Sequence, residues 1–177
     1  MNALHRALSA WIGLLALALL LGCAPKPAAT QPTPHLSTTA SPLAAPMIAT
    51  GEPPAERSDY RTALAGETPG FAEFLEAYEA AQTEPADWLR DPVEVALRAA
   101  GYAPSYEPDQ VTLYQTAPGQ ASVVLLLEGA EDDSVRDIEH RVDLTAVDNL
   151  WRVEWAGARW RCQVGRGQQD WGAELCI

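Results

Sequence analysis

The sequence predicts an α+β domain in which helices come first and an antiparallel meander of strands follows. Between residues 68 and 100, apolar residues recur every three to four positions, which is the helical period. From residue 111 onward, short runs of alternating or continuous apolar residues are separated by turn residues, as is typical of strands. We therefore expect N-terminal helices packed on a four- to five-stranded antiparallel sheet.

Two helices account for the first part of this domain. The first follows Thr68, which can cap a helix, and has Pro69 at its first position. The second begins at the capping sequence Asp91-Pro92, and Gly101 ends it. Each helix has one apolar stripe, formed by Phe71, Phe74, Leu75 and Tyr78 in the first and by Val93, Ala96, Leu97 and Ala100 in the second.

Four stretches are predicted to be strands, namely 111–116, 122–127, 136–145 and 150–164. The second is continuously apolar and suits a central strand that is covered on both faces. The third alternates, so one set of side chains faces the core and a charged set faces outward. The inward set is Ile138, His140, Val142 and Leu144, and the outward set is Asp137, Glu139, Arg141 and Asp143.

The last stretch allows two interpretations. If Ala156-Gly157 is a two-residue turn, the stretch is a hairpin that places Glu154 opposite Arg159. Otherwise it is one long strand with a bulge at Gly157. The hairpin would put Trp151, Val153, Trp155, Ala158, Trp160 and Cys162 on one face. At the level of fold alone, this order of elements resembles cystatin-like or nuclear-transport-factor-2-like rolls, and the analogy carries no residues with it.

The N-terminus carries a different signal. A weakly basic start, His5-Arg6, precedes an apolar run over residues 7–21, which is shorter than the ~20 residues of a membrane-spanning helix. The run ends in Leu20-Leu21-Gly22-Cys23, which resembles the lipobox of bacterial lipoproteins. The alternatives are an ordinary cleaved signal or an uncleaved anchor, with Cys23 incidental.

The lipoprotein resemblance implies a division of the chain into three parts. Residues 1–22 would be a signal peptide, and Cys23 would carry a diacylglyceryl group and usually a third acyl chain. The stretch 23–58 is rich in Pro, Ala, Thr and Ser, which predicts a disordered, extended tether. Residues 59–177 would be the globular domain, held outside the cytoplasm. Ala24 after the cysteine favours the outer membrane if the organism has two membranes.

The net charge and the cysteine content indicate which ligands and which covalent links the chain can have. The chain has a net charge of −12 at pH 7, which disfavours binding to nucleic acid. In an oxidising compartment, Cys162 and Cys176 predict a disulfide that closes a loop of about 15 residues. The alternative, a two-cysteine metal site, has no histidine near it in the sequence. We expect neither a metal nor a cofactor.

No nucleophile, phosphate-loop or metal-binding motif occurs in the sequence. His140, on the inner face of a strand, is either a general base in a pocket or a histidine satisfied within the core. The acidic stretch 128–134 is either a calcium loop or a solvated turn, and it lacks the ligand spacing of known calcium loops.

Two function hypotheses follow from these observations. The first is a binding module for an envelope protein or a cell-wall glycan, whose contact surface is formed by Arg159, Arg161, Arg166 and Trp171. The second is an enzyme or small-ligand-binding domain with a pocket around His140. The absence of catalytic motifs favours the first.

Overall fold

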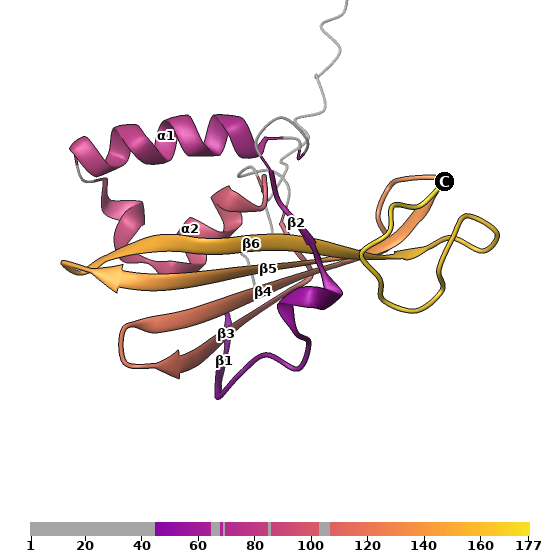
Figure 1. Cartoon of the computed structure of the whole chain (residues 1–177), viewed down its shortest axis with the longest axis horizontal. Helices are drawn as coiled ribbons and strands as arrows, with labels where there is room; N and C mark the ends of the chain where they lie inside the picture. The colour runs from indigo at the N-terminus through magenta and orange to yellow at the C-terminus, as the bar shows by residue number, and fades with distance from the viewer. Residues whose placement is uncertain (1–44, 65–67, 69, 85, 103–106) are drawn as a thin grey trace, which may run out of the picture. The chain divides into compact units, whose positions relative to one another are not determined.

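The computed structural model describes residues 45–64, 68, 70–84, 86–102 and 107–177. They form one six-stranded mixed sheet, in the order β1-β3-β4-β5-β6-β2, with two α-helices (Figure 1). The strands are β1 (Met47–Thr50), β2 (Arg61–Thr62), β3 (Gln110–Ala117), β4 (Gln120–Glu128), β5 (Val135–Val147) and β6 (Leu150–Cys162). The α+β class is thus confirmed.

Two features of the sheet differ from the prediction. The helices are not N-terminal, because two short strands precede them in the chain. One of these, β1, pairs in parallel with β3 at one edge of the sheet, whereas β2 pairs antiparallel with β6 at the other edge. Because of the surrounding prolines, this stretch was predicted to be part of a disordered tether. Prolines are nevertheless compatible with the end of an edge strand. The predicted tether 23–58 therefore overlaps the sheet from Met47 onward, while Cys23 and residues 1–22 lie outside the described residues.

The four central strands form the predicted antiparallel meander. The connection from β3 to β4 turns at Gly119, whose φ is +72°. The connection from β5 to β6 turns at Asp148 and Asn149, both with positive φ, which is the geometry of a tight hairpin turn. Asp and Asn tolerate this conformation better than other residues with a Cβ atom.

Helix α1 (Phe71–Thr83) and helix α2 (Pro92–Ala99) contribute to the core on one face of the sheet (Figure 1). Asp91 caps α2 as predicted, since its carboxylate accepts a hydrogen bond from the amide of Val93 at 2.9 Å. Helix α1 begins later than predicted, with Gly70 at the cap, and the hydroxyl of Thr68 instead accepts from the amide of Leu64. Pro69 lies outside the described residues.

The hydrophobic core lies between the helices and this face of the sheet. Its buried members come from both α-helices, from the 3-10 helix between them (Asp87–Arg90) and from strands β3 to β6. They include Phe74, Tyr78, Leu89, Val95, Val123, Leu125, Val142 and Leu144. Val142 and Leu144 are buried at inward positions that the alternation of 136–145 predicted, and Leu125 is buried in the continuously apolar strand β4. Among the described residues, no helix is long and apolar enough to cross a membrane.

The opposite face of the sheet is also covered, which the continuously apolar stretch 122–127 indicated but the charged, outward set of 136–145 did not. The crossing segment, residues 51–60, leads from β1 at one edge to β2 at the other (Figure 1). It packs against charged side chains of β5 that are buried. Arg141 donates to the carbonyl oxygen of Ala55 at 2.6 Å and makes a two-pronged contact with Asp143. Asp137, Arg141 and Asp143 are only 5%, 6% and 5% exposed, so the face predicted to be outward is buried.

The C-terminal strand resolves the two interpretations of residues 150–164. Strand β6 is continuous from Leu150 to Cys162, so the hairpin interpretation is wrong and Arg159 lies opposite Glu139 rather than Glu154. The irregularity is not at Gly157. The register with β5 shifts by one residue between Asp143 and Leu144. Asp143 pairs with Trp155 and Leu144 pairs with Val153, so Glu154 has no partner residue on β5. The slip puts Trp155 on the face of the crossing segment, where its ring meets Tyr60 edge-on at 5.9 Å.

Candidate ligand-binding pocket

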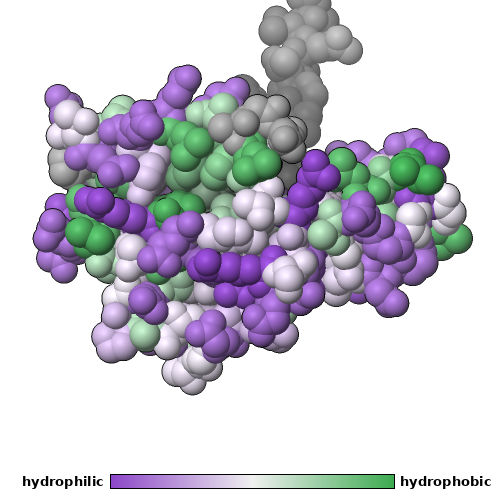
Figure 2. Space-filling model, viewed as in Figure 1, coloured by the Kyte–Doolittle hydropathy of each residue, from purple (hydrophilic) through white to green (hydrophobic). Residues whose placement is uncertain are grey.

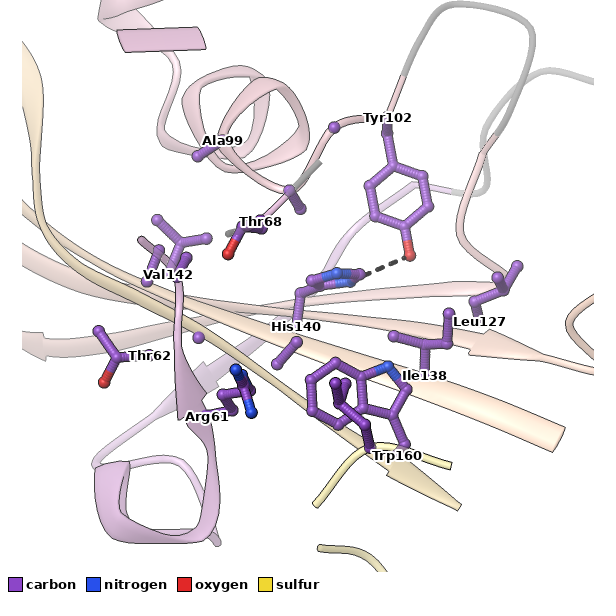
Figure 3. Close-up of a pocket in the computed structure, with 17 residues that line it drawn as sticks. Arg61, Thr62, Thr68, Ala99, Tyr102, Leu127, Ile138, His140, Val142 and Trp160 are labelled. Atoms are coloured by element: carbon purple, nitrogen blue, oxygen red, sulfur yellow. Dashed lines mark hydrogen bonds between the residues drawn. The ribbon is translucent and has the colours of Figure 1, made fainter. Parts of the chain in front are cut away.

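A pocket of about 370 Å³ opens on the helix-covered side of the sheet, between the C-terminal end of α2 and strands β2, β5 and β6 (Figure 3). Most of its lining is apolar. The apolar members are Ala63, Ala99, Ala100, Leu127, Ile138, Val142, Ala156, Ala158, Trp160 and Leu175, and the others are Arg61, Thr62, Thr68, Gly101, Tyr102, His140 and Gly157. Figure 2 shows hydrophobic surface on the same side of the sheet, between α1 and β6.

His140 lies in the wall of this pocket, as the second function hypothesis requires. It comes from β5 directly opposite Ala158 of β6, and its ring lies between Tyr102 and Trp160 in Figure 3. The Tyr102 hydroxyl is 3.4 Å from Nδ1 of His140, and the two rings meet edge-on with centroids 5.5 Å apart. Among the described residues, Nε2 has no hydrogen-bond partner, so it is the open polar atom of this side chain.

The environment of His140 keeps its imidazole neutral. Burial among apolar groups disfavours the charged form and lowers the pKa of His140 to about 4. No carboxylate is among the described residues that line the pocket. A general base is most effective when its pKa lies near the working pH, so a pKa of about 4 makes this histidine a weak base at pH 7. The neutral ring can still donate and accept hydrogen bonds.

The remaining polar side chains of the pocket interact within the protein. The hydroxyl of Thr62 accepts a hydrogen bond from the indole of Trp155 at 3.3 Å, and that of Thr68 accepts from the amide of Leu64. Arg61 is exposed and also interacts with another group of the chain. The pocket therefore combines apolar walls with one open imidazole nitrogen and with the indole N–H of Trp160, for which the described residues offer no acceptor.

The disulfide holds one wall of the pocket in place. Cys162 ends β6 and is bonded to Cys176, as the sequence predicted, with Cα atoms 5.5 Å apart. Leu175, next to Cys176, lines the pocket. Gly172 exchanges backbone hydrogen bonds with Trp160 at 2.9 and 3.1 Å, which joins the C-terminal tail to β6 beside the pocket.

The residues of the predicted contact surface lie elsewhere. Arg159 and Arg161 project from β6 on the face of the crossing segment, where they pair with Glu139 and Asp137 at 2.8 Å each. Both guanidinium groups contact the ring of Trp171, at 5.1 and 4.5 Å from its centroid. These three residues are thus brought together, with their positive charge balanced by carboxylates.

Arg166 belongs to a separate part of the surface. It pairs with Asp133 at 2.6 Å, which links the C-terminal tail to the acidic loop after β4. In that loop, Asp132 accepts hydrogen bonds from Ser134 and Val135 and closes a turn on itself. Within the described part of the chain, no group of three potential metal ligands comes together.

Sequence reasoning found His140 but missed the residues around it. Tyr102 follows α2 directly, and the glycine before it has a φ of +78° that turns the chain toward the sheet. A tyrosine just beyond a predicted helix end was the only available signal, because its distance to His140 depends on how α2 packs. Ala156 and Ala158 were visible as small residues, but the space they leave open is a property of the packing.

Comparisons with known proteins add no relative: no family model, curated protein or solved structure matches the chain.

Proposed function

We propose that this protein is an extracytoplasmic lipoprotein, anchored through Cys23, whose domain binds a small, mostly apolar molecule in the pocket around His140. The observation that carries this proposal is the pocket itself, with a volume of about 370 Å³, largely apolar walls and one neutral imidazole. Small-molecule sites are typically concave, apolar and ~300–1,000 Å³ in volume, with few polar groups.

Binding fits the pocket better than catalysis does. A histidine that acts as a general base is usually oriented by a hydrogen-bonded partner, commonly a carboxylate, and has a pKa near neutrality. Here the partner is a tyrosine hydroxyl at 3.4 Å, and the pKa is about 4. The role supported by these features is that of a neutral hydrogen-bonding group that orients a ligand.

The pocket is also a better candidate than the basic surface. The guanidinium groups of Arg159 and Arg161 are already paired with Glu139 and Asp137, so an acidic partner would have to compete with internal carboxylates. Arg166 is paired with Asp133 in the same way. An envelope protein or a cell-wall glycan that binds at Trp171 is therefore the less favoured hypothesis.

The anchoring rests on the sequence Leu20-Leu21-Gly22-Cys23. Two or more acyl chains, at ~0.8 kcal/mol per buried methylene, hold a protein stably on a membrane. The outer membrane is the proposed location in an organism with two membranes. For the fold, likeness to a cystatin-like or nuclear-transport-factor-2-like roll is likewise a proposal, and the function does not depend on it.

Metabolic labelling tests the anchor. The full chain is expressed in a bacterium that is fed an alkyne-tagged palmitate, and a fluorescent azide then reveals acylated protein. We expect label on the protein, and its loss in Cys23→Ser. Label that persists in Cys23→Ser, or none in the unaltered chain, would contradict lipidation at this cysteine.

Dye binding tests the pocket. The full-length Cys23→Ser chain, without an acyl chain that could itself bind the dye, is titrated with N-phenylnaphthylamine, which fluoresces strongly in apolar surroundings. Ala158→Leu places a larger side chain opposite His140 in the pocket, and we expect it to weaken binding at least about tenfold.

The matched control is Ala146→Leu, on β5, which does not line the pocket. It should leave dye binding unchanged, and circular dichroism should be the same for both variants. Equal dye binding by Ala158→Leu and the unaltered pocket would contradict the proposal.

A further inference from the structure

The polar atoms of the pocket restrict the kind of ligand it can hold. Of its side chains, His140 presents an imidazole nitrogen, Nε2, without a partner among the described residues. Trp160 adds an indole N–H for which the described residues likewise offer no hydrogen-bond acceptor. A ligand atom that pairs with either nitrogen gains a hydrogen bond there, and with it affinity. Imidazole and indole nitrogens together favour an oxygen atom on the ligand.

The walls of the pocket disfavour a charged ligand. They are formed mainly by alanine, valine, isoleucine and leucine side chains and by the ring of Trp160. Transfer of an isolated charge into such surroundings is costly unless an opposite charge is present. Neutral His140 provides none. Arg61, the one charged side chain among the described residues of the lining, is exposed and already interacts within the chain.

The shape of the walls adds a third restriction. The flat indole of Trp160 lies on one side of the His140 ring and Tyr102 on the other (Figure 3). Aromatic side chains pack well against flat, apolar rings. A volume of about 370 Å³ leaves room for a molecule of two or three rings, because it equals about a dozen water molecules at ~30 Å³ each.

We propose that the pocket selects an uncharged ligand with a flat apolar body and one hydroxyl or carbonyl oxygen, which hydrogen-bonds to Nε2 of His140. This inference rests on the proposed function and adds to it the chemical class of the ligand. His140 then recognises the oxygen, while Trp160 and the aliphatic walls hold the apolar body.

Four matched probes test this selection by isothermal titration calorimetry with the full-length Cys23→Ser chain. Naphthalene, naphthol, naphthoate and naphthylmethylammonium share one ring system and differ in the polar group. We expect naphthol to bind about fivefold more tightly than naphthalene, the factor that corresponds to one hydrogen bond of about 1 kcal/mol. Naphthoate and the ammonium compound should both bind more weakly than naphthalene.

His140→Phe keeps a ring of similar size but has no ring nitrogen. In this variant naphthol and naphthalene should bind equally, with naphthalene retained as evidence that the pocket is intact. The matched control is Tyr78→Phe, which removes a polar atom from a core aromatic residue that does not line the pocket. It should keep the fivefold preference.

The outcomes separate this inference from the proposed function. Tightest binding by naphthoate would overturn the inference and point to an anion held by Arg61, while the pocket itself would stand. A preference for naphthol that survives in His140→Phe would also overturn it, because another group would then recognise the oxygen. Absence of binding by all four probes would overturn both the inference and the proposed pocket.

Discussion

Strand β5 has two faces that are buried by opposite means. On the helix side, Val142 and Leu144 are 1% and 2% exposed and pack against apolar residues. On the other side, Arg141 and Asp143 are almost as inaccessible, but they are held by hydrogen bonds and ion pairs to one another and to the crossing segment. One face is covered by two α-helices and the other by the crossing segment, which contains only one turn of 3-10 helix, Arg57–Asp59.

The difference shows why a short segment is enough on the charged side. Burial alone would raise the pKa of Asp143, but hydrogen bonds from Arg141, Ser122 and Arg57 outweigh it and hold that pKa below its usual value. Ser122 donates to the carboxylate at 2.6 Å, and Arg57 approaches it at the same distance. Nearly every polar group on this face has a partner, so little apolar area is needed to stabilise it.

The largest expected effect is on the charged face. Arg141→Leu removes one partner of a buried ion pair and leaves Asp143 and the carbonyl of Ala55 without it. We expect the free energy of unfolding to fall by about 4 kcal/mol. Urea denaturation followed by circular dichroism measures it. The control is Arg98→Gln, in an exposed pair with Glu94, which should cost less than ~1 kcal/mol. If both variants lost the same free energy of unfolding, the buried pair of Arg141 and Asp143 would contribute no more to stability than an exposed ion pair does.

A cavity in the apolar face comes next. Leu125 is fully buried in the core between β4 and the helices. Leu125→Ala should lower the free energy of unfolding by about 3 kcal/mol, from lost apolar transfer and from the cavity that remains. The same urea titration measures it. A loss below ~1 kcal/mol would show that this face is loosely packed, in contrast to the structure.

The two faces should lose stability in different pH ranges. The pKa of His140 is about 4 in the folded state and 6.5 in the unfolded state, so the unfolded chain binds more protons between these values. Stability is then full above pH 6.5 and falls by at most about 3 kcal/mol as the pH drops to 4. The pKa values of Asp137 and Asp143 are lowered, so their contribution is present above the usual aspartate range and is lost only in stronger acid.

His140→Phe separates these two ranges. Its free energy of unfolding, measured by urea titrations between pH 7 and pH 3, should be flat where the unaltered protein declines from pH 6.5 to 4. The loss in stronger acid should remain. An unchanged slope above pH 4 would show that the imidazole is protonated in the folded state.

The smallest expected effect concerns the contact of the crossing segment with β5. The Tyr60 hydroxyl donates to the carboxylate of Glu139 at 2.5 Å, and burial together with that carboxylate raises the pKa of Tyr60. Tyr60→Phe should destabilise the protein by about 1 kcal/mol only, because Arg159 still pairs with Glu139. Thermal denaturation measures it. A loss as large as that of Arg141→Leu would place the main support of the crossing segment at Tyr60.

The features that depend on nearby residues could be predicted from the sequence. The cap at Asp91, the turn at Asp148-Asn149 and the alternation in β5 depend on neighbours a few residues away, and the structure has all three. The disulfide was also predictable, because two cysteines remained after Cys23 was assigned to the lipid. A continuous β6 was only one of two interpretations, since Ala156-Gly157 is compatible with both a turn and a strand.

The sequence by itself determined the α+β class, the meander, the charge that disfavours nucleic acid and the lipobox-like start. Tertiary structure alone decided that residues 51–60 cover the charged face and that Tyr102 meets His140 beside an open space. These contacts join residues 79 and 38 positions apart, and no local pattern encodes them. Alternation in a strand specifies which side chains share a face, but what covers that face depends on where the rest of the chain packs.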